Sequence, residues 1–197
     1  MKIARALAAA TMLAVLTGQG APVAAQAPAA GAELDPRIQQ LIASISEERL
    51  QQLLTRLASF HTRNTLSDPG APNGLGDARQ WILDEMMKAS PRLQVSFDTH
   101  LVPAGGRIPQ ETELRNVIAV LPGRSPRRIY VSGHYDSLNL RQRPDPNAAA
   151  PGANDDGSGT VLSMELARVF AGSGIEFDAT LVFMAVAGEE QGLVGST

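Results

Sequence analysis

Residues 128–187 place an amphipathic helix between two short apolar runs, and this pattern constrains the fold more than any other feature. Arg128–Ser132 and Thr180–Ala187 have the length and apolar content of strands buried on both faces. Residues 156–171 between them carry apolar side chains at helical spacing. A strand, a helix and a second strand in that order favour parallel strands. Both strands are therefore expected to end at the same edge of one sheet.

The residues before 128 predict further elements of the same sheet and its helices. Leu34–Phe60 is predicted to be one helix, with Ser44 and Glu47 as a capping box, and residues 77–89 a second helix. Val95–Leu101 alternates with polar residues, which predicts a half-exposed edge strand, and residues 116–121 predict a buried strand. The fold class is therefore expected to be α/β, with three α/β/α layers around a mixed, centrally parallel sheet.

Charge and cysteine content exclude several classes of function. The net charge of the 197-residue chain is −3, and its basic residues form no long run, so nucleic acid and an anionic membrane surface are not expected partners. The chain has no cysteine, which excludes a disulfide scaffold, a cysteine-ligated zinc site and a thiol nucleophile. Ser132 and Ser158 lack a G-x-S-x-G context, so a serine hydrolase is disfavoured.

The first residues of the chain have the features of a secretory signal peptide. Lys2 and Arg5 precede the apolar stretch Ala6–Thr17, and Ala25–Ala27 offers a small-x-small cleavage site. We expect a signal peptide over residues 1–27, a disordered lead-in over 28–33, and a secreted or periplasmic protein. A mitochondrial transit peptide and an uncleaved anchor are the alternatives. The remaining segment, 34–197, is expected to form part of one domain.

Acidic residues and one histidine follow the predicted strands and precede the predicted helix. His134 and Asp136 come directly after the first strand, Asp155 and Asp156 open the helix, and Glu189-Glu190 follows the second strand. In an open α/β sheet, ligands bind at the carboxyl ends of the strands. An imidazole and several carboxylates gathered there suit one or two divalent metal ions.

Each of these three motifs also has an ordinary structural interpretation. Asp136 either accepts a hydrogen bond from a metal-ligating His134 or is a simple strand-end residue. The Asp155-Asp156 pair either bridges two metals or caps the helix. Within Glu189-Glu190, one carboxylate ligates a metal and the other acts as general base, or the pair is a solvated turn. The other histidines, His61 and His100, are expected at the surface.

Taken together, the order and spacing of the motifs resemble metallopeptidase family twenty-eight, whose members are co-catalytic zinc aminopeptidases and carboxypeptidases. The resemblance covers about residues 50–197 and implies two zinc ions. It implies that His134 and Glu190 each ligate one zinc, that Asp155 bridges both, that Asp136 supports His134, and that Glu189 is the general base. It also implies that the peptide bond between Asp155 and Asp156 is often cis.

The resemblance further implies two ligands, an Asp and a His, downstream of the Glu pair, and the chain ends at Thr197 before either. We therefore expect an N-terminal fragment, truncated at its C-terminus and inactive by itself. The expected function is a zinc-dependent exopeptidase, an aminopeptidase acting on peptides or proteins. The alternatives are a single-zinc acyltransferase resembling glutaminyl cyclase and a non-catalytic binding module on the same fold.

Overall fold

The structure, a computed structural model, describes residues 34–143 and 145–197. The expected signal peptide, residues 1–27, and the expected lead-in, residues 28–33, lie outside these residues. Along the chain come helices α1 to α3, strands β1 to β3, helix α4 and strand β4. The helices are α1 (Pro36–Ala43), α2 (Glu47–Ala58), α3 (Leu75–Ala89) and α4 (Ser158–Gly172). The strands are β1 (Gln94–Val102), β2 (Thr112–Leu121), β3 (Arg128–His134) and β4 (Thr180–Val186).

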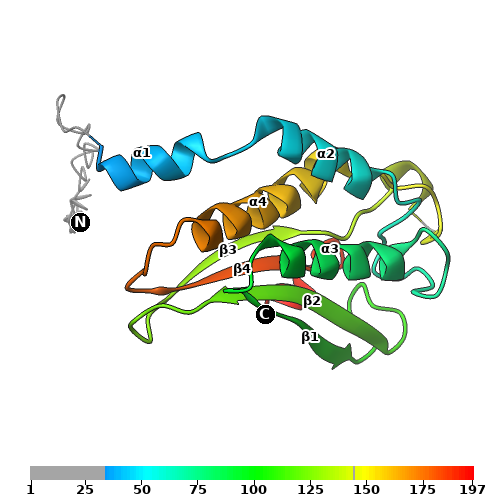
Figure 1. The fold of residues 1–197 in the computed structure, drawn as a ribbon. Coiled ribbons are helices and arrows are strands. Elements are labelled where there is room, and N and C mark those ends of the chain that lie inside the picture. Colours follow the sequence, from blue (N-terminus) through cyan, green and yellow to red (C-terminus); the bar gives the residue numbers. More distant parts are fainter. Residues whose placement is uncertain (1–33, 144) are drawn as a thin grey trace, which may run out of the picture. The chain divides into compact units, whose positions relative to one another are not determined.

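The four described strands form one mixed sheet in the order β1-β2-β4-β3 (Figure 1). β3 and β4 are parallel, with Gly133 opposite Ala185 and His134 opposite Val186. β2 runs antiparallel to both β4 and β1. The parallel pair joined through α4 confirms the prediction from the strand–helix–strand pattern, and β1 lies at a sheet edge, as its alternating sequence predicts.

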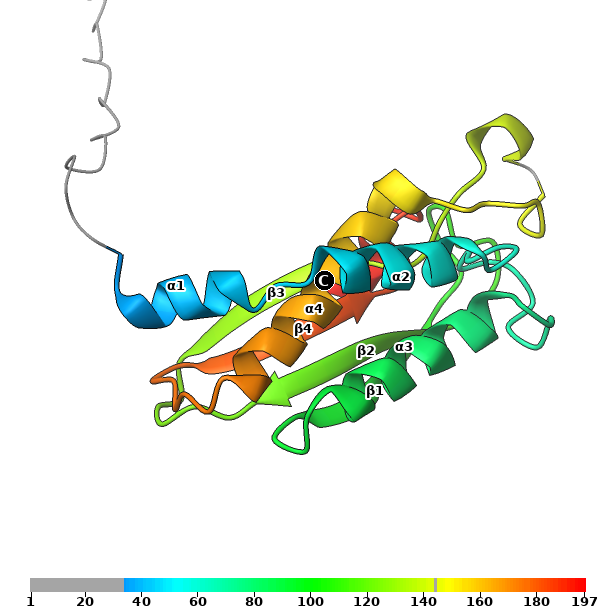
Figure 2. The same cartoon turned by 45° about the horizontal axis from the view of Figure 1, so that its top comes forward.

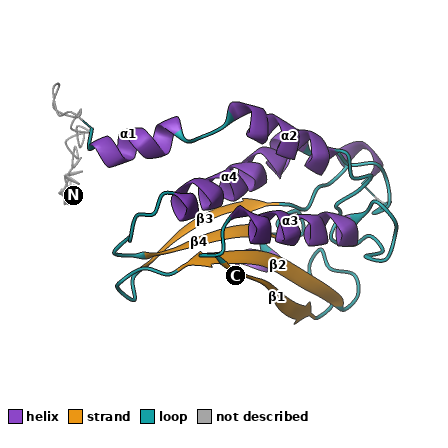
Figure 3. Cartoon of the chain, viewed as in Figure 1, coloured by secondary structure: helices purple, strands orange, loops and turns teal. Residues whose placement is uncertain are grey.

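Helices α2, α3 and α4 cover one face of this sheet (Figures 2 and 3). α4 packs on β3 and β4, α3 packs on β1 and β2, and α2 packs on α4. The core between these layers is apolar, with Leu57, Ile82, Met86, Val117, Met164, Ala167 and Phe183 among its fully buried members. The α/β class and the mixed sheet are thus as predicted, while the helices of residues 34–143 and 145–197 form a single layer rather than two.

The N-terminal helical region is divided, and the single helix predicted over Leu34–Phe60 is wrong. α1 ends before Ser44, and α2 begins after Ser46, whose hydroxyl oxygen accepts a hydrogen bond from the Arg49 backbone N–H at 3.1 Å. The N-cap of α2 is therefore Ser46, and the predicted Ser44–Glu47 capping box does not form. An equally good capping residue two positions later, together with contacts to α4, determines where the helix begins.

Strand β3 is more exposed than its apolar sequence predicts. Ile129 and Tyr130 expose 54% and 58% of their surface, because β3 is an edge strand of the described sheet. The prediction that this strand is buried on both faces is therefore wrong for the residues the structure describes. Among those same residues, no helix is long and apolar enough to cross a membrane.

The first turn of α4 lies against the end of β3, and glycines make this contact possible. A Cβ atom added to Gly133 would stand 2.3 Å from the Gly159 backbone carbon and 2.3 Å from the Thr160 nitrogen. Any side chain at Gly133 would therefore force the helix away from the strand. Because the backbones touch here, the residues just before α4 lie beside the residues that end β3.

Candidate metal centre and active site

The predicted site residues lie at one end of the sheet, on loops that follow β3 and β4 and precede α4 (Figure 3). His134 is the last residue of β3, and Glu189 and Glu190 follow β4 after a short turn at Gly188. Asp155 and Asp156 belong to an irregular turn, Ala153–Gly157, that leads into α4. The expectation that the three motifs meet at one edge agrees with this arrangement.

His134 is the centre of the cluster, because both of its ring nitrogens face carboxylates. Nε2 lies 3.1 Å from Asp155 Oδ1 and 3.7 Å from Glu189 Oε2. Nδ1 lies 3.5 Å from Asp136 Oδ1 and 3.2 Å from the Asp136 carbonyl oxygen. Burial lowers the pKa of His134, but hydrogen bonds to Asp136 and the charges of Asp136 and Glu189 outweigh it and raise the pKa to about 9.

Asp136 is fully buried and joins the ends of β3 and β4 through its carboxylate. The backbone N–H groups of Glu189 and Glu190 donate to its two oxygens at 3.3 and 3.2 Å. The Thr65 hydroxyl donates to Oδ2 at 3.1 Å. These donors fix the carboxylate beside Nδ1 of His134, which is the position from which a carboxylate orients a metal-ligating histidine.

The two residues of the Asp155-Asp156 pair have different contacts, one with the site and the other with the helix. The peptide bond between them is cis, as the resemblance implies. Asp155 is largely exposed and faces His134. Asp156 instead caps the helix: its Oδ1 accepts the Gly159 N–H at 2.9 Å, and its Oδ2 accepts the His134 N–H at 3.1 Å. The capping interpretation therefore applies to Asp156, while Asp155 remains available to a ligand.

The two glutamates after β4 have different surroundings. Glu189 keeps 36% of its side chain exposed and approaches His134. Glu190 has no side-chain ion pair or hydrogen bond to the described residues, and it lines a neighbouring cavity. Burial raises the pKa of Glu190, and the nearby charges of Asp155 and Asp136 raise it further. A cation at this place would relieve that repulsion.

The donor set agrees in chemistry with zinc. Two ligands of one tetrahedral zinc ion stand about 3.4 Å apart, given zinc–nitrogen and zinc–oxygen bonds of about 2.1 Å. The His134–Asp155 separation of 3.1 Å is close to this value. In residues 34–143 and 145–197, no group of at least three His, Cys, Asp or Glu side chains is arranged to hold a metal ion. The described chain therefore presents two candidate ligands, His134 and Asp155, at a suitable separation, with Glu190 nearby.

Sequence reasoning missed two buried residues that support the site, Arg63 and Thr65. The Arg63 guanidinium donates to four backbone carbonyls, of Leu57, Tyr135, Pro151 and Gly152. Burial lowers its pKa to about 10, with Asp136 acting in the opposite direction. Thr65 joins Asp136 to the Gly188 N–H, which donates to its hydroxyl oxygen at 3.1 Å.

Nothing in the local sequence marks Arg63 or Thr65, because all of their partners except the Leu57 carbonyl lie about 70 to 120 positions away in the chain. By contrast, His61 and His100 are exposed, as expected, and stand apart from the cluster. His61 contacts the Asn147 carbonyl oxygen at 3.1 Å, and His100 pairs with Asp98.

Known proteins are similar to this chain in both sequence and fold. The model of peptidase family M28 matches residues 116–197. A "probable zinc metalloprotease" of Leptosphaeria maculans is 40% identical over 169 residues, which are 82% of this chain and 38% of that protein. "Leucine aminopeptidase 1" of Trichophyton equinum is 33% identical over 169 residues, 81% of this chain and 41% of that protein. The chain thus spans less than half the length of these relatives.

Solved structures show the same architecture. The LapA aminopeptidase of Legionella pneumophila is 26% identical, with a TM-score of 0.63, over 83% of this chain and 40% of that one. A glutaminyl cyclase of Porphyromonas gingivalis has a TM-score of 0.61 at 19% identity, over 75% of this chain and 49% of that one. At that identity the second likeness shows the fold alone, so the fold does not separate peptidases from cyclases.

Proposed function

Because residues 116–197 of this chain belong to peptidase family M28, we propose that the full-length protein, this chain with any sequence that flanks it, is a zinc-dependent aminopeptidase. The observation that carries the proposal is the cluster of His134, Asp155 and Glu189 at the carboxyl ends of two parallel strands. Asp155 lies 3.1 Å and Glu189 3.7 Å from Nε2 of His134. An imidazole beside exposed carboxylates in such a crevice suits metal-assisted hydrolysis.

We propose that the full-length protein would bind two zinc ions, with His134 and Glu190 as ligands of different ions and Asp155 as a ligand shared by both. When bound, zinc supplies a Lewis acid for the scissile carbonyl and lowers the pKa of water. Asp136 holds the imidazole of His134 from the Nδ1 side, so that Nε2 points to the exposed side of the crevice. The Asp136 carboxylate also accepts hydrogen bonds from the backbone N–H groups of Glu189 and Glu190, which holds the backbone of both glutamates at this end of the sheet.

Glu189 is proposed as the general base. Its partly exposed carboxylate stands beside the ligand pair and can reach a water molecule there. It takes the proton from the water that attacks the scissile carbonyl carbon, and it passes that proton to the amine that leaves when the C–N bond breaks. Such positioned proton transfer contributes about 10²- to 10⁴-fold to rate.

The choice of aminopeptidase over carboxypeptidase is supported by relatives rather than by the crevice itself. The names of the Trichophyton equinum and Legionella pneumophila proteins are aminopeptidase names.

Secretion or periplasmic export is a separate proposal that rests on the N-terminal sequence. N-terminal sequencing of the mature protein tests it: a first residue at or near position 28 supports export, and an intact Met1 contradicts it.

The aminopeptidase proposal is tested with paired peptides. The purified full-length protein should remove residues from a peptide with a free N-terminus and leave its N-acetylated form intact. A chelator should abolish the reaction, and added zinc should restore it. Release of residues from the C-terminus of the acetylated peptide would show a carboxypeptidase. Cyclisation of an N-terminal Gln without hydrolysis would replace the proposal with a glutaminyl cyclase.

A further inference from the structure

A cavity of about 580 Å³ opens beside Glu190. This volume lies within the range of small-molecule sites in proteins, about 300–1,000 Å³. Its walls come from loops far apart in the sequence: the segment after α2, the loop between β1 and β2, the loop after β3 and the turn after β4. The polar lining residues are Asn64, Arg107, Gln110, Arg143, Glu190 and Gln191.

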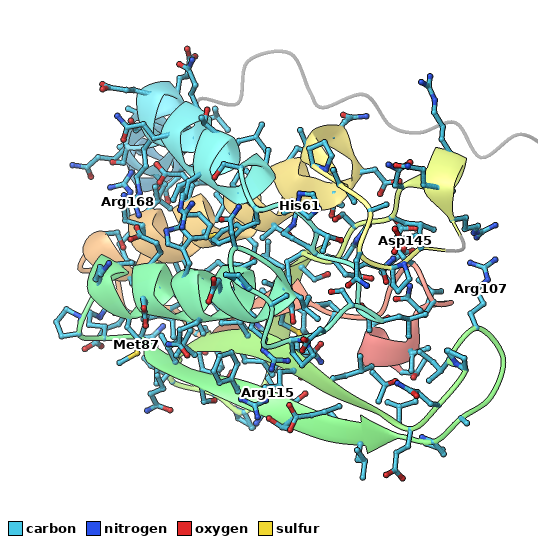
Figure 4. All side chains as sticks on the ribbon, turned by 90° about the vertical axis from the view of Figure 1, so that its right-hand side faces the viewer. His61, Met87, Arg107, Arg115, Asp145 and Arg168 are labelled. Carbon is cyan, nitrogen blue, oxygen red and sulfur yellow. The ribbon has the colours of Figure 1, made fainter. Side chains whose placement is uncertain are left out.

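Arg107 is held at the edge of the candidate active site. It lies on the loop between β1 and β2, and its Nη1 donates to the carbonyl oxygen of Glu190 at 3.2 Å. Figure 4 shows Arg107 pointing from this loop toward the loop that carries Asp145. The guanidinium has further N–H groups beyond the one used for this bond. Arg107 is thus anchored to the backbone of a proposed zinc ligand while it lines the cavity.

Arg143 lines the same cavity from the loop after β3. Its guanidinium makes no hydrogen bond or ion pair with any other residue of the described ranges, 34–143 and 145–197. Glu190 is the single carboxylate among the lining residues. If Glu190 binds zinc, the metal balances its charge, and the described lining residues then include two cationic groups and no free carboxylate.

Two guanidinium groups with neighbouring side-chain amides form an environment suited to a carboxylate, because arginine matches carboxylate geometry with paired N–H donors. We propose that this cavity is a subsite that binds a carboxylate of the peptide substrate, through Arg107 and Arg143. The proposal rests on the function proposed above and adds the substrate class. The carboxylate comes either from an acidic side chain next to the cleaved residue or from the C-terminus of a short peptide.

Four substrates separate these sources in the full-length protein. Leu-Ala-Ala carries only the terminal carboxylate, and its amide carries none. Leu-Glu-Ala-amide carries only an acidic side chain, and Leu-Gln-Ala-amide is its neutral match. We expect kcat/KM to be at least about tenfold higher for one carboxylate substrate than for its neutral match, as charge-assisted hydrogen bonds imply. The substrate pair whose two kcat/KM values differ identifies the source of the carboxylate.

Substitutions of Arg107 and Arg143 test whether these two arginines cause the preference for a carboxylate substrate. The double substitution Arg107→Gln and Arg143→Gln should remove the preference, so that kcat/KM becomes equal for each carboxylate substrate and its neutral match. Arg141→Gln is the matched control: it removes a positive charge two residues from Arg143, at a position that does not line the cavity. This control should keep the preference. Equal rates within both substrate pairs, or a preference that survives in the double variant, would overturn the subsite.

A binding measurement keeps the subsite separate from the proposed function. The same four peptides are titrated calorimetrically into the Glu189→Gln protein, in which turnover should be about 10²- to 10⁴-fold slower. Tighter binding of a carboxylate peptide, lost in the triple variant with both arginines replaced, supports the subsite even if the wild-type protein hydrolyses none of the peptides. In that case the peptidase assignment alone falls. Equal binding of all four peptides rejects the subsite.

Discussion

At the scale of single residues, the site depends on buried groups that do not face a substrate. Asp136 holds His134 on one side and the backbone of Glu189 and Glu190 on the other. Thr65 donates to this carboxylate and accepts from the Gly188 N–H. A single hydroxyl group therefore connects the loop after α2 to the ends of both parallel strands. Its removal leaves the buried Gly188 N–H unpaired and takes one of three hydrogen-bond donors from the Asp136 carboxylate.

The substitution Thr65→Val tests this role, because valine keeps the shape and removes the hydroxyl. We expect a loss of about 1–3 kcal/mol in the free energy of unfolding, the cost of unpaired buried polar groups. We also expect zinc affinity to fall by about 10- to 100-fold, as for other residues that orient metal ligands. Urea denaturation and competitive zinc titration of the full-length protein measure the two effects.

Thr65→Ser is the matched control, since it restores the hydroxyl and removes only a methyl group. It should bind zinc with close to wild-type affinity. If the serine variant loses as much zinc affinity as the valine variant, packing of the methyl group is responsible, and the positioning role of the hydroxyl is rejected.

At the scale of elements, the site forms where α4 touches the end of β3. The contact is backbone against backbone, with Gly133 facing Gly159 and Thr160. It brings Asp155, which precedes the helix, to His134, which ends the strand. The geometry of this one junction therefore determines whether the two proposed ligands meet.

Substitution of Gly133 by alanine should disturb this junction. Its Cβ would stand 2.3 Å from backbone atoms of α4, so the helix must move. We expect a destabilisation of about 1–3 kcal/mol, as for other overpacked sites, together with weaker zinc binding. Gly172→Ala, at the other end of the same helix, meets no atom within 4 Å. That control should be neutral or stabilise by up to about 1 kcal/mol. Equal stability of the two variants in urea denaturation would contradict this account.

A second junction joins α4 to the connection between α1 and α2. The buried Glu165 accepts the Ser46 N–H at 2.9 Å and pairs with Arg168 and Arg49. Burial raises the pKa of Glu165, but the hydrogen bonds to Arg168 and Ser46 and the charges of both arginines outweigh it and lower the pKa. Ionised Glu165 therefore contributes to stability above its unfolded pKa, about 4.3, and loses that contribution as the pH falls through its lower folded pKa.

The substitution Glu165→Gln should therefore destabilise the protein near pH 7, by about 1–3 kcal/mol, and the difference from wild type should shrink as the pH falls below about 4. Glu48→Gln, at an exposed position of α2, removes the same charge and should change stability little. Denaturation curves recorded across this pH range measure both variants. A Glu165→Gln deficit that stays constant from pH 7 into strong acid would show that the carboxylate charge is not responsible.

At the scale of the whole molecule, residue patterns within short segments predict the individual elements and the connections between neighbouring elements. The strand–helix–strand pattern predicts the parallel pair β3 and β4, and the motifs at its ends predict the place of the site. The exposure of β3 depends on its place at the edge of the described sheet. The break between α1 and α2 and the roles of Arg63 and Thr65 depend on contacts between distant segments. Such contacts leave no periodic signal in a single sequence.

His134 is proposed to bind zinc and Glu189 to move a proton, and one paired measurement distinguishes these two roles. Zinc content and peptide hydrolysis are measured together on the full-length wild-type protein, Glu189→Gln and His134→Ala. We expect Glu189→Gln to retain its zinc and lose about 10²- to 10⁴-fold in kcat, whereas His134→Ala should lose both zinc and activity. A Glu189→Gln protein that hydrolyses peptides at the wild-type rate, or a His134→Ala protein with full zinc content, would contradict these roles.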